Sequence, residues 1–139
     1  MNLEEIKTRA HKLYKQGTRL DNKGQRPQRV EKVLQRAVSM DPFNLAYHRR
    51  YICYLIKHGR VEDARVAWEC AVDLLRSPDG HSRRSLYSLF HKEVAISLAQ
   101  KNEVDFAVEV LGAVPESILR RDKDMVELAL KITNYQVAS

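Results

Sequence analysis

The stretch GRVEDARVAWECAV, residues 59–72, repeats the apolar pattern of QRVEKVLQRAV, residues 28–38, after 34 positions. Small or apolar residues stand at matching places in the two segments, as Val30, Leu34 and Ala37 in the first and Ala64, Trp68 and Ala71 in the second. Steps of four and three put the members of each set on one face of a helix. A fixed period of this length is typical of stacked helix pairs, in which neighbouring units bury each other's apolar faces.

Turn residues divide the rest of the chain into further pairs. Proline or glycine stands at positions 24, 27, 42, 59, 78, 80 and 115, and apolar residues recur at steps of three and four between them. This pattern predicts antiparallel helix pairs over roughly 2–41, 44–76 and 82–114, followed by a capping helix over 116–136. The insertion RSPDGHSRR, residues 76–84, displaces the third unit, so that its apolar pattern follows that of the second after 43 positions.

These segments predict a single domain over residues 1–139 with an all-α fold. The chain is 44% hydrophobic, which is enough for one continuous core at this length. We expect a right-handed α-α superhelix of about three stacked antiparallel helix pairs plus the C-terminal capping helix. Alanines let helices approach closely and aromatic side chains fill wider gaps, so a structural role is expected for Tyr47, Tyr51, Ala64, Trp68 and Ala71.

The second unit resembles the tetratricopeptide repeat in the order of its residues. A glycine turn at Gly59 is followed by the small Ala64, the bulky Trp68 and the small Ala71. The match extends over roughly residues 10–115. The resemblance implies a non-enzymatic scaffold or adaptor that binds a peptide or helix of a partner protein within a larger complex.

A related family, the half-a-tetratricopeptide repeat of RNA-processing scaffolds, is similar in other details. Its second-helix pattern is matched by Ala64-Arg65 followed by Trp68-Glu69. This resemblance implies, as the alternative function, an RNA-associated subunit of an RNA-processing or transcription assembly. Such a subunit would use the basic N-terminal helix pair.

In tetratricopeptide proteins the first helix of each pair lines a concave surface that holds the partner. Carried over by position, this surface would be formed by seven cations of this chain, namely Lys12, Lys15, Arg19, Arg49, Arg50, Lys57 and Lys92. Two positions that hold asparagine in the binders of C-terminal carboxylates are Arg19 and Cys53 here. The resemblance therefore implies a general basic groove for acidic peptides rather than a specific carboxylate clamp.

The positive charge of the chain is concentrated at its beginning. Residues 1–36 contain ten Lys or Arg against four Asp or Glu, whereas the other 103 residues carry fourteen of each sign. The whole net charge of +6 thus belongs to the first predicted helix pair. Such a charge can simply form a solvated surface. If it binds a partner, the expected partner is an acidic peptide or helix of another protein, with nucleic acid as the less favoured alternative.

Other function classes lack their motifs in this sequence. The five histidines and the two cysteines, Cys53 and Cys70, follow no zinc-ligand spacing, and there is no glycine-rich phosphate loop or Gly-x-Ser-x-Gly motif. We therefore expect no catalytic residues, no metal and no cofactor. No apolar run approaches the length of a membrane span, so we expect an intracellular protein, cytoplasmic or nuclear, without a membrane partner. Its uncapped terminal helices suggest dimerisation or docking.

Overall fold

The structure is a computed structural model that describes residues 2–24, 26–76 and 84–138. Over these residues all regular secondary structure is helical, which confirms the all-α class. The helices are α1 (Leu3–Asn22), α2 (Pro27–Met40), α3 (Leu45–Lys57), α4 (Val61–Arg76), α5 (Arg84–Gln100), α6 (Val104–Gly112), α7 (Glu116–Arg121) and α8 (Lys123–Ala138). None of the described helices is both long and apolar enough to cross a membrane.

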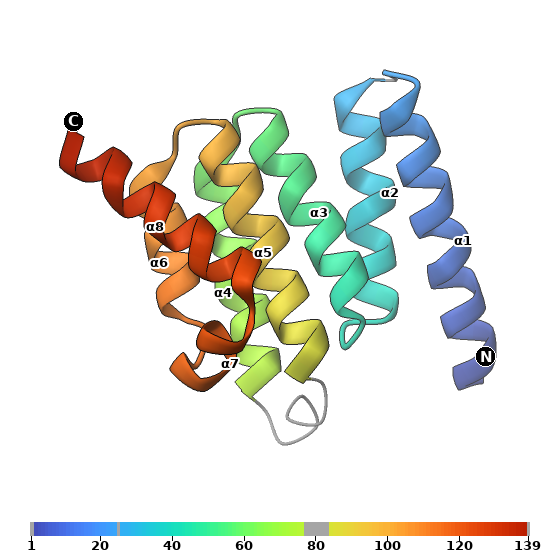
Figure 1. The fold of residues 1–139 in the computed structure, drawn as a ribbon. Helices are drawn as coiled ribbons and strands as arrows, with labels where there is room; N and C mark the ends of the chain where they lie inside the picture. Colours follow the sequence, from blue (N-terminus) through green and yellow to red (C-terminus); the bar gives the residue numbers. More distant parts are fainter. Residues whose placement is uncertain (1, 25, 77–83, 139) are drawn as a thin grey trace.

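Consecutive helices pack against each other as α1 with α2, α3 with α4, and α5 with α6. Helix α3 also packs against α2 and α5, and α8 packs against α6 (Figure 1). The chain therefore runs from the α1–α2 hairpin at one end of the molecule to α8 at the other, with the two termini far apart (Figure 1).

The turns that connect α3 to α4 and α5 to α6 have the same backbone geometry. After α3, Gly59 takes a left-handed conformation with φ 75°, while the Arg60 amide donates to the Leu55 carbonyl at 2.9 Å. After α5, Asn102 takes φ 60° and the Glu103 amide donates to the Leu98 carbonyl, also at 2.9 Å. Both are Schellman motifs, and asparagine is the residue that best replaces glycine in this conformation. From the sequence alone, an asparagine just before a helix is a candidate N-cap, so Asn102 could be expected to cap α6. The N-cap position is instead held by Glu103, whose side chain makes no capping hydrogen bond.

The repeated apolar residues lie in the core. Ala64 and Ala71 have no exposed surface, and Trp68 is only 5% exposed. The Trp68 indole meets the ring of Phe106 edge to face, with centroids 5.6 Å apart. This aromatic pair connects α4 to α6, across the boundary between two helix pairs.

A second, smaller apolar cluster holds the N-terminal hairpin. It consists of the buried residues Ala10, Ala37 and Tyr47, with Tyr14 packed beside them and its ring centroid 4.9 Å from that of Tyr47. Tyr51 is half-buried at the edge of the main core. The tyrosines of α3 therefore serve packing between helices.

The C-terminal segment differs from the expected single helix over 116–136. It is divided into α7 and α8 at Asp122, whose backbone is extended. The Asp122 carboxylate accepts a hydrogen bond from the Met125 amide at 3.2 Å and thus caps the start of α8. Its other oxygen lies 3.3 Å from Lys92 Nζ on α5, which fixes the break against the body of the molecule.

Helices α1 and α2 approach closely at Gly17. A Cβ atom at this position would lie 2.6 Å from Leu34 Cδ2 and 2.9 Å from Leu34 Cγ, and Leu34 is itself buried. Glycine is therefore required by space, although it lowers helix propensity by about 1 kcal/mol relative to alanine.

We predict that Gly17→Ala lowers the free energy of unfolding by about 1 kcal/mol, because overpacking costs about 1–3 kcal/mol and outweighs the gain in helix propensity. Urea denaturation measures this change. The matched control is Gly112→Ala in α6, where nothing lies within 4 Å of the added atom, so that the same substitution leaves stability unchanged or raises it. Equal effects of the two substitutions would contradict the steric explanation.

His48 links pH to stability at the turn before α3. Its Nε2–H donates to the Pro42 carbonyl at 2.6 Å, and burial lowers the pKa of the ring below its ordinary 6.5, against opposing effects of that hydrogen bond and of Asp41. The unfolded chain therefore binds the proton more readily than the folded chain, and stability falls as the pH decreases below 6.5.

Denaturation at about pH 7.5 and about pH 5.5 tests this linkage. We expect His48→Gln, which retains a hydrogen-bond donor, to reduce the loss of stability at the lower pH. The control His11→Gln alters an exposed ring and should leave that loss as in the wild type. If the two variants behave alike, another group causes the acid sensitivity.

Candidate binding surface on the N-terminal hairpin

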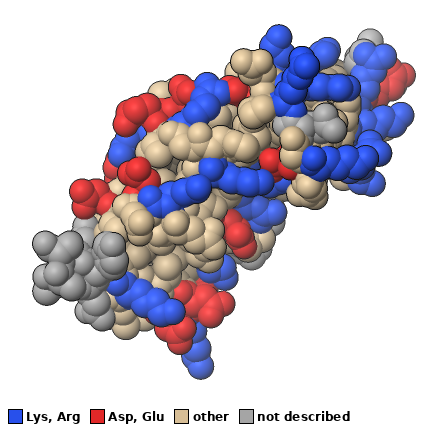
Figure 2. Space-filling view, turned by 90° about the horizontal axis from the view of Figure 1, so that it is seen from above, with Lys and Arg blue, Asp and Glu red and all other residues tan. Residues whose placement is uncertain are grey.

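The ten Lys and Arg residues of the first 36 positions all have exposed side chains. They lie on α1, on α2 and on the turn between them, and Lys and Arg crowd this end of the molecule in Figure 2. None of the ten forms an ion pair with a described residue. The hairpin thus presents a dense set of cations to solvent.

The cations follow the helix repeat. On α1 and at its C-cap, Lys12, Lys15, Arg19 and Lys23 are spaced by three or four residues, so they form one stripe away from the buried Gly17. On α2, Arg29, Lys32 and Arg36 follow the same spacing and are likewise exposed. Two basic stripes therefore run along the hairpin. We call this surface, made of the ten cations between Lys7 and Arg36, the basic hairpin face.

The acidic residues of the hairpin do not neutralise this face. Glu4 and Glu5 lie in the first turn of α1, where the helix dipole favours anions. Glu31 pairs with Arg60, which lies in the turn between α3 and α4 and also contacts Asp63. The remaining acid, Asp21, is bound from α3.

Asp21 is the centre of a buried ion cluster. Its side chain is only 4% exposed, and one carboxylate oxygen lies 2.7 Å from an Arg50 guanidinium nitrogen. The other oxygen lies 3.3 Å from Lys57 Nζ and 3.7 Å from His58 Nε2. The negative end of a helix dipole disfavours an anion in the last turn. The three cations of the cluster offset this unfavourable interaction between Asp21 and the C-terminal end of α1.

The seven cations predicted from the tetratricopeptide resemblance fall into two groups. Lys12, Lys15 and Arg19 are exposed and belong to the basic hairpin face. The others lie on α3 and α5, where Arg50 and Lys57 bind Asp21, Lys92 binds Asp122 and Asp124, and Arg49 is half-buried. The intramolecular pairs use the charges of Arg50, Lys57 and Lys92. Of the seven predicted cations, those that are both exposed and unpaired with a described residue are therefore the three on α1.

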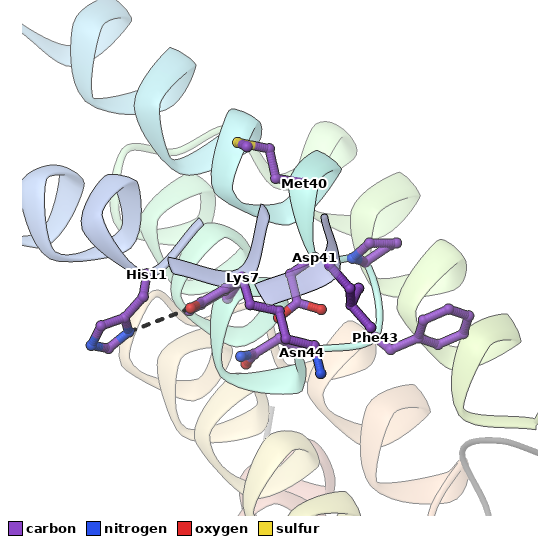
Figure 3. Close-up of a pocket in the computed structure, with 9 residues that line it drawn as sticks. Lys7, His11, Met40, Asp41, Phe43 and Asn44 are labelled. Carbon is purple, nitrogen blue, oxygen red and sulfur yellow. Dashed lines mark hydrogen bonds between the residues drawn. The ribbon is translucent and has the colours of Figure 1, made fainter. Parts of the chain in front are cut away.

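A groove opens at the beginning of α1, beside the turn from α2 to α3. Its volume is about 650 Å³, within the range of about 300–1,000 Å³ typical of ligand sites. It is lined by Lys7 and His11 of α1 and by Met40, Asp41, Phe43 and Asn44 around the turn from α2 to α3 (Figure 3). The Tyr47 hydroxyl in its wall lies 3.4 Å from His11 Nδ1.

A second groove of about 430 Å³ lies between α2, α3 and α4. Its charged residues are Glu31, Arg60 and Asp63, which pair with one another. Because these charges are already satisfied, this groove offers no free ionic group to a partner.

Metal or thiol chemistry has little support in the described part of the chain. There, no three His, Cys, Asp or Glu residues are grouped as they would be around a metal ion. Both cysteines are free thiols, and burial raises the pKa of Cys53, which favours its uncharged form. A raised pKa makes a thiol less nucleophilic at neutral pH.

The Asp21 ion cluster could not be predicted from the sequence, because Arg50 and Lys57 are 29 and 36 residues away from Asp21 along the chain. The position of Asp21 near the end of α1, where the helix dipole disfavours an acid, is the one local indication that Asp21 has a cationic partner.

We predict that Asp21→Asn lowers the free energy of unfolding by about 2 kcal/mol. Loss of one partner of a fully buried pair costs about 3–5 kcal/mol, and the partial exposure of Arg50 and Lys57 reduces this cost. The control is Glu116→Gln, which removes an exposed pair with Arg120 and should change stability little. Denaturant titration measures the free energy of unfolding of both variants. If both substitutions change it by the same small amount, the buried cluster is not stabilising.

Comparison with known proteins does not assign this chain to a family. No protein-family model matches the chain, and no curated protein matches it. The resemblance to tetratricopeptide repeats therefore stays a prediction, and the function has to be inferred from the basic hairpin face and the groove beside it.

Proposed function

We propose that this chain is a non-enzymatic adaptor that binds an acidic segment of a partner protein through its basic hairpin face. The observation that carries the proposal is the set of ten exposed cations on α1, α2 and their turn, none of which is paired with a described residue. Free cations at this density repel one another, and an acidic partner relieves that repulsion.

A tetratricopeptide-like stack of three antiparallel pairs in a right-handed superhelix is part of the same proposal. It is supported by the shared turn geometry at Gly59 and Asn102 and by the packing of α3 against both α2 and α5. In such a stack each unit contacts mainly its neighbours, and a terminal unit keeps one face free for a partner. The basic hairpin lies at one end of the described helices (Figure 1).

An acidic protein segment fits this face better than RNA does. Proteins that bind single-stranded nucleic acid combine cations with aromatic side chains on which bases stack. Here Tyr47 and Tyr54 are buried and Tyr14 and Tyr51 are half-buried, and among the described side chains Phe43 is the one exposed aromatic. The face offers charge without a row of stacking rings.

The test compares charge reversals at opposite ends of the molecule. The triple variant Lys12→Glu, Lys15→Glu and Arg19→Glu should weaken binding of a poly-glutamate peptide at least about tenfold at about 50 mM salt, measured by fluorescence anisotropy. The control reverses Lys101, Arg121 and Lys131, which are also exposed and form no ion pair with a described residue but lie on the other half, and it should change binding little.

Binding of a single-stranded uridine oligonucleotide is measured with the same variants. Stronger binding of this RNA than of the peptide, with a steep salt dependence, would favour the RNA-associated alternative. Equal losses in the hairpin triple variant and its control would contradict a localised site, because long-range attraction to the net charge would then explain the binding.

A further inference from the structure

The groove at the beginning of α1 combines exposed apolar side chains with free cations. Six large hydrophobic residues are exposed among those described, and two of them, Leu3 at 63% and Phe43 at 54%, line this single groove. Exposed apolar residues that are gathered around one concavity often indicate a binding site. The remaining four are Val66, Leu89, Val108 and Leu130, which lie on α4, α5, α6 and α8.

One row of side chains leads out of the groove along α1. Lys7 and His11 lie in its wall, and Lys15 follows at the next step of four residues. Steps of four along a helix advance by about 6 Å, so the three groups span about 12 Å along one side of α1. All three side chains are exposed, and neither lysine has an ion-pair partner among the described residues.

We propose that this groove receives one large apolar side chain of the partner, either aromatic or long and aliphatic, from a segment whose neighbouring residues are acidic. The inference rests on the proposed function and adds the anchor that charge alone does not provide. Charge complementarity determines the occupant: the acidic residues beside the anchor lie along Lys7, His11 and Lys15, and the anchor itself lies between Leu3, Met40 and Phe43.

The polar groups of the groove fix the orientation of the segment. Asp41 lines the groove from the turn between α2 and α3, forms no ion pair with a described residue, and repels acidic residues of the partner from that turn. It can accept a hydrogen bond from a backbone amide of the bound segment. The acidic residues are thereby directed toward α1, and the basic hairpin face binds them.

The experiment begins with a random peptide-display library selected on the wild-type chain. The expected result is enrichment of peptides with one large apolar residue next to acidic residues. The enriched peptide is then labelled and titrated against Phe43→Ala and Leu3→Ala, which should each weaken binding about tenfold, because each substitution removes apolar surface that packs against the anchor. The matched controls are Val66→Ala and Leu130→Ala, which truncate equally exposed residues elsewhere and should leave affinity unchanged.

A second measurement locates the anchor directly. The enriched peptide with benzoylphenylalanine at its apolar position should crosslink to Met40 or Phe43 on irradiation, as mapped by mass spectrometry. Crosslinks confined to residues outside the groove would overturn the inference even if Phe43→Ala weakened binding indirectly.

The outcomes separate this inference from the function on which it rests. If selection enriches acidic peptides without an apolar residue, and Phe43→Ala binds as the wild type while the Lys12, Lys15 and Arg19 reversals do not, the anchor fails and the acidic partner stands. If selection enriches no acidic residues, or the uridine oligonucleotide binds more tightly than every selected peptide, both proposals fail.

Discussion

The buried carboxylate of Asp21 provides the ionic connection between α1 and α3. This single anion joins the first helix to Arg50 and Lys57 of α3, and it is almost fully withdrawn from water. Its pairing uses cations of the second unit, so that none of the hairpin's own lysines and arginines is needed to satisfy it. The same interaction that holds α1 in place therefore leaves the basic hairpin face uncompensated and ready for an external anion.

The fold could be predicted from the sequence where a residue acts on its neighbours. The spacing of Ala64, Trp68 and Ala71 indicates a helix that is buried on one face, and all three are buried. Gly59 marks a turn because few other residues adopt its conformation at low cost. Asn102 takes the same conformation, but asparagine also favours helix N-caps, so the sequence alone suggested the wrong role.

The site could be predicted only in part, because ion pairs join residues far apart in the chain. Excess charge in the first 36 residues is visible without a structure, and so are Lys12, Lys15 and Arg19 as candidates. The intramolecular partners of Arg50 and Lys92 are not visible, since Asp21 and Asp122 lie about 30 residues from them and in other helices. The groove is formed by side chains from the start of α1, from the end of α2 and from the turn that follows α2. No local sequence pattern indicates that these segments come together.

The few buried residues of α1 have a consequence for motion. This helix of 20 residues buries only Ala10, Gly17 and Asp21, of which one has no side chain and one is charged. Native proteins open locally where few buried apolar contacts hold a segment, so we expect the amides of α1 to exchange with solvent before those of α3 and α5. A ligand that binds only the folded form of α1 would stabilise that form and slow the exchange of its amides. The N-terminal hairpin would then become more ordered on binding.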